Sequence, residues 1–200
     1  MVLPSIPHCF CRQTRSSVLA SDPHTVALVA HATTPNRSVR ALRATLRRAR
    51  GTLAVSYALE ADLDLLRIPA VGSRTIGPLW RHTCLELFIM RPGESAYFEM
   101  NFAPSGECAA YAFERYRDGM RPIAQAFDPA IRVRCTASVL ELEAEVMLDR
   151  LSPDYTHGVL ALGIAAVIED TSRALSYWAL AHPRESADFH DARAFTLVVS

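Results

Sequence analysis

Hydrophobic and polar residues alternate most regularly between Leu79 and Met120, in the stretch LWRHTCLELFIMRPGESAYFEMNFAPSGECAAYAFERYRDGM. A period of two is typical of half-buried β-strands. Short turn sequences, PG and PSG, divide the stretch into three alternating runs. The pattern therefore predicts a β-meander whose strands are Cys84–Met90, Ala96–Phe102 and Cys108–Phe113.

The pairing of the first two strands depends on the length of the loop between them. A four-residue loop at Arg91–Glu94 predicts that Leu85 faces Met100 and that Glu86 faces Glu99. One face then buries Leu85, Leu87, Ile89, Phe98, Met100 and Phe102, and the other carries both glutamates. Like charges directly opposite one another destabilise a strand pair by about 0.2–1 kcal/mol. We therefore expect this face to hold an arginine, with Arg81 and Arg117 as candidates, or a cation or a polar ligand.

The rest of the chain predicts more strands and no long helix. Ser38–Arg50 fits either a basic amphipathic helix or a strand, and a strand that turns at Gly51 is favoured because the whole chain then joins one antiparallel system. The apolar run Val159–Ile168 predicts a strand buried on both faces. Alternation predicts further strands at His24–His31, Thr52–Leu59, Ile131–Thr136, Val139–Leu148, Leu175–Leu180 and Phe195–Val199. The predicted fold class is all-β, an antiparallel β-sandwich or jelly roll of about eleven strands.

One of these hairpins has a register that two patterns support independently. Placing Arg134 opposite Glu141 and Arg132 opposite Glu143 also places Val133 opposite Leu142. These ion pairs predict a solvent-facing surface and no function.

Composition narrows the functional classes. The chain has 200 residues, 50% of them hydrophobic, which fits a single domain at 23–200 after a loose leader at 1–22. Equal numbers of basic and acidic side chains, 21 each, predict no nucleic-acid partner and no anionic membrane partner. Pro4 and Pro7 interrupt the segment that a signal peptide would need, and five cysteines without framework spacing suggest free thiols. Both features predict a cytoplasmic protein.

Three stretches, LWRHTCLELFI, YFEMNFAPSGECAAYAFERYRDGM and SYWALAHPRESADFH, resemble the bacterial DOMON-like proteins related to family-nine carbohydrate-binding modules. The resemblance spans roughly residues 24–200 and is most specific over Leu79–Met120 and Tyr177–His190. It implies a β-sandwich that holds a small ligand on its concave face or rim, and the wider superfamily binds both sugars and haem. A shared fold does not identify the ligand.

The candidate site combines flat aromatic side chains with polar ones. A pyranose packs its C–H face on an aromatic ring, while carboxylates, amides and guanidinium groups bind its hydroxyls. The expected function is non-catalytic binding of a small polar ligand, a sugar or sugar derivative. The expected ligand-binding residues are Trp80, Arg81, Glu86, Glu99, Asn101, Arg117, Trp178, His182 and His190. The alternative for both tryptophans is a place in the core or at the rim.

Other chemistries stay open. A metal ion has two candidate sites in histidine-containing segments, His8-Cys9-Phe10-Cys11 and the set His182, Asp188 and His190. Calcium would suit Glu86 and Glu99, and haem would need axial ligands such as His82 or Met100. A small hydrolase-like enzyme that uses Glu86 and Glu99, or a protein-interaction domain, are the remaining alternatives. The oligomeric state is not predicted.

Overall fold

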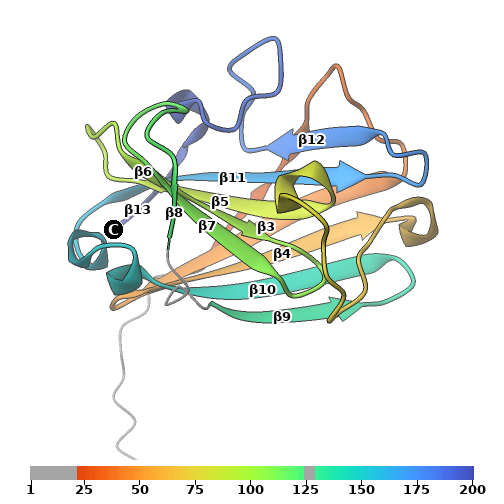
Figure 1. Ribbon diagram of the computed structural model, residues 1–200, viewed down its shortest axis with the longest axis horizontal. Helices are drawn as coiled ribbons and strands as arrows, with labels where there is room; N and C mark the ends of the chain where they lie inside the picture. Colours follow the sequence, from red (N-terminus) through yellow and green to blue (C-terminus); the bar gives the residue numbers. More distant parts are fainter. Residues whose placement is uncertain (1–21, 124–128) are drawn as a thin grey trace, which may run out of the picture.

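The computed structural model describes residues 22–123 and 129–200, which form thirteen strands in two antiparallel sheets (Figure 1). Two of these strands, β2 and β8, have only two residues each, so eleven are longer. The all-β antiparallel sandwich predicted from the sequence is confirmed. The metal site considered at His8-Cys9-Phe10-Cys11, and all but the last residue of the predicted leader, lie outside the described residues.

The five-stranded sheet contains the hairpin that the sequence left ambiguous. Residues 39–49 form a strand because Leu42 and Leu46 point into the core, while Arg43 and Arg47 point outward. Gly51, at φ +70°, adopts the left-handed conformation that the tight hairpin turn requires. The strand order is β1 (His24–Ala27), β3 (Val39–Ala49), β4 (Thr52–Ala61), β10 (Val139–Met147) and β9 (Ala130–Cys135).

The eight-stranded sheet contains the meander and most of the C-terminal half of the chain. Its order is β2 (Val29–Ala30), β12 (Leu175–Ala179), β11 (Leu160–Glu169), β5 (Cys84–Met90), β6 (Tyr97–Phe102), β7 (Cys108–Phe113) and β8 (Arg121–Pro122). The last strand, β13 (Leu197–Val199), pairs with the first residues of β11, whereas β12 pairs with its last ones. Short 3₁₀ helices connect the strands: η1 (Leu63–Leu65), η2 (Leu79–Arg81), η3 (Leu148–Arg150), η4 (Pro153–Thr156) and η5 (Ala192–Ala194).

The core lies between the inner faces of the two sheets. The predicted inner set is confirmed at Leu85, Leu87, Ile89, Met100 and Phe102, which are all fully buried, while Phe98 is half-buried. All ten residues of β11 are buried, as its continuous apolar run predicts. Tyr57 crosses the core from the other sheet, and its hydroxyl donates to the backbone carbonyl of Glu86 at 2.8 Å. The backbone beneath Glu86 is therefore fixed from below.

The register predicted for β5 and β6 is wrong by two residues. Leu85 pairs with Phe102 rather than with Met100, and Glu86 faces Asn101 rather than Glu99. The reason is the loop, which spans six residues (91–96) instead of four. An even shift keeps every side chain on its predicted face, so Glu86 and Glu99 still share the outer face, as diagonal rather than direct neighbours. The register predicted for β9 and β10 is confirmed.

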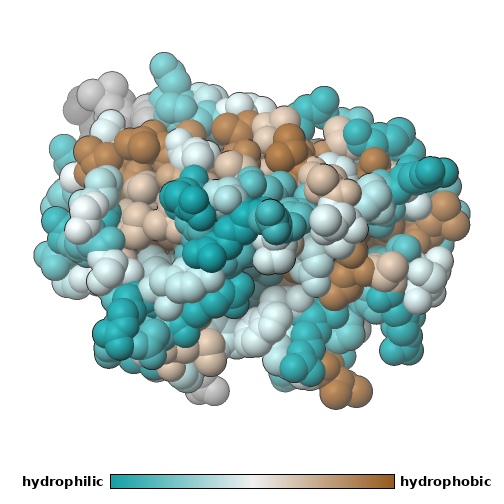
Figure 2. All heavy atoms as spheres, turned by 90° about the horizontal axis from the view of Figure 1, so that it is seen from above, coloured by the Kyte–Doolittle hydropathy of each residue, from teal (hydrophilic) through white to brown (hydrophobic). Residues whose placement is uncertain are grey.

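The outer face of the eight-stranded sheet is covered by the segment 180–196, which we call the covering loop. Phe195 from this loop stacks on Phe88 of β5 with ring centroids 5.6 Å apart. A Cβ at Gly163 would lie 2.4 Å from the Phe195 ring, so the loop approaches β11 this closely only because position 163 is glycine. Figure 2 views the molecule from the side on which this loop lies in Figure 1, and hydrophilic side chains cover the middle of that face.

Of the cysteines within the described residues, Cys84 is buried, Cys108 is partly buried and Cys135 is exposed. Over the same part of the chain, no helix combines the length and the apolar character needed to cross a membrane.

Candidate functional site

A cavity of about 800 Å³ lies between the covering loop and the outer face of the eight-stranded sheet. Glu86 pairs with the small Ala165 on β11, which in turn pairs with Ala179 on β12. Larger side chains form the walls. The residues lining the cavity include Thr33, Thr34, Trp80, Arg81, Glu86, Glu99, Phe113, Arg117, Tyr177, Ser186, Phe189 and His190.

Glu86 lines this cavity with only 3% of its surface exposed. Its carboxyl group has no hydrogen-bond or ion-pair partner among the described residues, and since no fully buried side-chain oxygen there lacks a partner, its oxygens are accessible from the cavity. The amide opposite it, on Asn101, is already engaged, since its nitrogen donates to Glu99 at 2.6 Å and its oxygen accepts from the thiol of Cys84 at 3.4 Å. Burial, and next the charge of Glu99, raise the pKa of Glu86 well above its usual value.

Glu99 is 5% exposed and receives the Asn101 hydrogen bond. Burial raises its pKa, although the Asn101 bond and the charge of Arg117 oppose the rise. The guanidinium predicted to fork between the two glutamates does not do so. Arg117 pairs with Asp188 instead, and Arg81 is exposed at the cavity wall with no ion pair among the described residues. The raised pKa of both carboxyl groups favours their protonated forms, which repel each other less than two carboxylates do.

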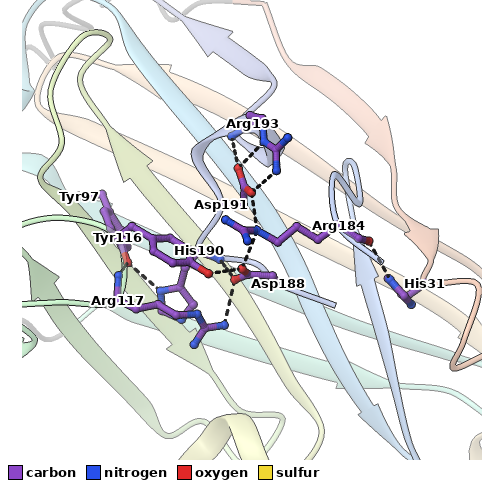
Figure 3. Close-up of polar contacts among 9 residues, drawn as sticks. All are labelled: His31, Tyr97, Tyr116, Arg117, Arg184, Asp188, His190, Asp191 and Arg193. Atoms are coloured by element: carbon purple, nitrogen blue, oxygen red, sulfur yellow. Dashed lines mark hydrogen bonds and ion pairs between the residues drawn. The ribbon is translucent and has the colours of Figure 1, made fainter. Parts of the chain in front are cut away.

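Asp188 fastens the covering loop to the turn that follows β7 (Figure 3). It accepts from the hydroxyl of Tyr116 at 2.6 Å, from Nη2 of Arg117 at 2.9 Å and from the backbone N–H of His190 at 3.2 Å. Nε of Arg184 lies 3.2 Å away. Burial alone would raise the pKa of Asp188, but the hydrogen bonds from Tyr116 and Arg117 hold it below its usual value. Asp188 is therefore a structural anion that holds Arg117 in place.

His190 is neutral at pH 7. Burial, reinforced by the charge of Arg117, lowers its pKa to about 4. The Tyr97 hydroxyl accepts from the backbone N–H of Arg117 at 3.2 Å and shares a second hydrogen bond with Nδ1 of His190 at 2.8 Å (Figure 3). Nε2 of His190 lies 3.7 Å from Glu99, which is too long for a hydrogen bond. The contact with Glu99 is consequently not an ion pair at neutral pH.

The two tryptophans lie on opposite faces of the eight-stranded sheet. Trp80, on η2, lines the cavity and contacts Tyr111 edge to face with ring centroids 5.5 Å apart. Trp178 packs in the core between the sheets, where its Nε1 donates to Ser176 at 3.1 Å. The expectation that Trp178 faces the site is therefore wrong, because the strand pleat turns Tyr177 toward the cavity instead.

The histidines and carboxylates of the covering loop do not assemble into a metal site. His182 does not line the cavity, and its Nε2 lies 2.9 Å from the carbonyl of Val29. Residues 22–123 and 129–200 contain no group of three or more histidine, cysteine, aspartate or glutamate side chains that could hold a metal ion. The set His182, Asp188 and His190 predicted for a metal is thus separated.

Of the nine residues expected to bind a ligand, six line the cavity: Trp80, Arg81, Glu86, Glu99, Arg117 and His190. Asn101 lies beneath it, fully buried, and positions Glu99. The sequence did not indicate Thr33, Thr34, Ser186 or Phe189, which belong to loops without periodicity. Tyr177 carried a usable signal, because neighbours in a strand face opposite sides and only one of Tyr177 and Trp178 could reach the core.

No protein-family model matches this chain, and no curated protein matches it in sequence. Solved structures do share its fold. A candidate carbohydrate-binding protein from Bacteroides uniformis is similar with a TM-score of 0.69 and 13% identity, over 88% of this chain and 84% of that one. A family-nine carbohydrate-binding module from Caldicellulosiruptor kristjanssonii in complex with glucose gives a TM-score of 0.43 and 12% identity, over 76% and 74% of the two chains. The first of these likenesses supports the β-sandwich fold.

Proposed function

We propose that this protein binds a sugar or a sugar derivative in the cavity beneath the covering loop, without transforming it. The observation that carries this proposal is the combination of a buried carboxyl group without a protein partner, Glu86, and an aromatic wall that includes Trp80 and Tyr177. A buried polar group without a partner is unfavourable. A ligand that supplies the missing donor removes that cost.

The cavity suits a molecule with one apolar face and several hydroxyl groups. Its volume of about 800 Å³ lies within the range of small-molecule sites. Aromatic rings supply flat packing surfaces, and Thr33, Thr34 and Ser186 supply hydroxyl groups around the same space. The similar fold of a candidate carbohydrate-binding protein is consistent with this proposal but does not identify the ligand.

Calorimetric titration with monosaccharides and disaccharides tests the proposal. We expect saturable binding to the wild type, and we expect Trp80→Ala to weaken it by about tenfold or more, because stacking and apolar burial each contribute on the order of 1 kcal/mol. Trp80→Phe is the matched control, since it keeps an aromatic face and should retain part of the affinity. Binding that Trp80→Ala leaves unchanged, or thermal stabilisation by calcium or haem alone, would contradict a sugar site at this cavity.

One observation favours a second candidate, a hydrolase. Glu86 and Glu99 lie on one face, and burial raises the pKa of both carboxyl groups, as it does for the general acid of such enzymes. Chromogenic aryl glycosides separate the two readings. We expect the wild type to release no product. Product release that disappears in Glu99→Gln would show that the protein is a hydrolase and would contradict the proposed binding function.

A further inference from the structure

The floor of the cavity has more hydrogen-bond acceptors than donors. Glu86 and Glu99 bring two carboxyl groups to one face of the sheet, and the one protein donor to them among the described residues is the Asn101 amide, which Glu99 takes. Cys84, the other polar neighbour, directs its thiol to Asn101. The carboxyl group left for a ligand donor at this floor is therefore that of Glu86.

The surrounding cations do not correct this imbalance. Asp188 holds the guanidinium of Arg117 at 2.9 Å, and the charge of Arg117 lowers the pKa of both glutamates without cancelling the rise that burial causes. His190 carries no charge at neutral pH because its environment is buried. Arg81, also on the lining, is exposed to solvent. Because burial raises the pKa of Glu86 and no ion pair among the described residues offsets that rise, a ligand that brings a positive charge favours the ionised carboxylate.

We infer that the ligand is an amino sugar, a hexosamine with a free amino group, whose ammonium donates to the carboxylate of Glu86. This inference rests on the proposed function and specifies its ligand class. An ammonium supplies three donors and a compensating charge, whereas a hydroxyl group supplies one donor and no charge. The aromatic wall also favours a cation, because aromatic faces attract ammonium groups.

The binding step has a defined proton balance. Burial keeps Glu86 protonated to higher pH than an exposed glutamate. When an ammonium group binds, the carboxyl proton passes to the buffer and the complex holds a carboxylate beside an intact ammonium. The other titratable or charged groups that act on Glu86, or on which it acts, are Tyr57, Cys84, Glu99 and Arg117. A neutral sugar leaves the proton on Glu86, so proton release distinguishes the two ligands.

Calorimetric titration of the full-length protein with three sugars tests this inference. Glucosamine carries the ammonium, N-acetylglucosamine carries the same nitrogen without its charge, and glucose carries a hydroxyl at that position. The titrations are run slightly below neutral pH in phosphate and in MOPS, which contain no primary amine and differ in ionisation enthalpy. We expect glucosamine to bind at least about tenfold more tightly than the other two sugars, since charge-assisted hydrogen bonds are the stronger ones. We also expect its binding enthalpy to differ between the buffers by the heat of the released proton.

Two variants locate the effect. Glu86→Gln keeps the shape of the side chain and removes its charge, so it should abolish both the glucosamine preference and the proton release. Glu141→Gln removes an exposed carboxylate from the five-stranded sheet and should preserve both.

The outcomes separate this inference from the function on which it rests. Equal affinity for glucose and glucosamine would overturn the amino-sugar inference and leave sugar binding intact. A glucosamine preference that persists in Glu86→Gln would overturn the role of Glu86. If none of the three sugars binds, and none binds to Glu86→Gln, both the inference and the proposed function fail.

Discussion

The outer faces of the two sheets carry the same residue type in two very different environments. Glu143, on the five-stranded sheet, has a side chain that is 42% exposed and faces Arg132 and Arg134 at 3.9 and 3.7 Å. Glu86, on the eight-stranded sheet, is 3% exposed, and its carboxyl group has no hydrogen-bond or ion-pair partner among the described residues. The first glutamate belongs to an ordinary solvated surface, and the second belongs to a candidate site.

The difference comes from what covers each face rather than from the strands themselves. The covering loop places Phe195 over Gly163 and places His190 beside Phe88 and Tyr97. Its position is fixed by Asp188, which binds side chains from the turn after β7. Strand alternation thus decides which face a glutamate occupies, and tertiary cover decides whether that face meets solvent.

The largest expected effect on stability concerns the two tryptophans, which lie on opposite faces of the eight-stranded sheet. Trp178→Ala should lower the free energy of unfolding by about 3–5 kcal/mol, because the ring fills the core between the sheets. Trp80→Ala should lower it by less than about 2 kcal/mol, since Trp80 is only partly buried at the cavity wall. Urea unfolding at one temperature measures both variants.

Sugar affinity completes that test. Below its unfolding transition, Trp178→Ala should keep the affinity of the wild type, whereas Trp80→Ala should lose it. The reverse pattern, with Trp178→Ala stable and unable to bind, would contradict the assignment of the two rings to opposite faces.

Much of the fold could be predicted from the sequence because the relevant signals are local. Local patterns identified most strands of both sheets, but they missed β8 and predicted one strand at His24–His31 where β1 and β2 belong to different sheets. The hairpin of β9 and β10 had its register fixed by agreeing charge and apolar patterns. The shared face of Glu86 and Glu99 was also predictable, since an even register shift preserves it. Local patterns therefore identified the central pair of the site.

What could not be predicted depends on contacts between distant segments. The six-residue loop between β5 and β6 contains a Pro-Gly pair that equally suits a shorter hairpin. The predicted register therefore differs from the observed one by two residues. The partner of Arg117 is Asp188, 71 residues further along the chain, and no periodicity connects them. The covering loop itself has no regular pattern, so its cover over Glu86 was not visible in the sequence.

The next largest expected effect is the pH dependence of stability that comes from His190 in the covering loop. The pKa of His190 is about 4 in the folded protein, against a usual value of 6.5. Between these values the unfolded chain binds a proton that the folded protein does not, so stability falls as the pH drops from 6.5 to 4. The full loss is about 3 kcal/mol. His190→Asn, which keeps an acceptor for the Tyr97 hydroxyl, should lack this component when urea midpoints are compared at several pH values.

His157 provides the control because it is exposed and distant from the covering loop in the sequence. His157→Asn should follow the wild-type pH dependence throughout. If His190→Asn also followed it, the neutral and buried state of His190 would be refuted.

The smallest expected effect compares the two glutamates directly. The pKa of folded Glu86 lies above its usual value of 4.5, so from pH 4.5 upward the folded protein keeps a proton that the unfolded chain has lost. Its contribution to stability therefore falls as the pH rises toward the folded pKa. Glutamine does not titrate, so Glu86→Gln should gain stability relative to the wild type as the pH rises, with a difference below about 2 kcal/mol. Glu143→Gln should stay within about 0.5 kcal/mol of the wild type at every pH, as is usual for exposed ion pairs. Unfolding free energies measured from pH 5 to pH 8 decide between the two, and parallel curves for Glu86→Gln and wild type would show that cover by the loop does not change the titration of Glu86.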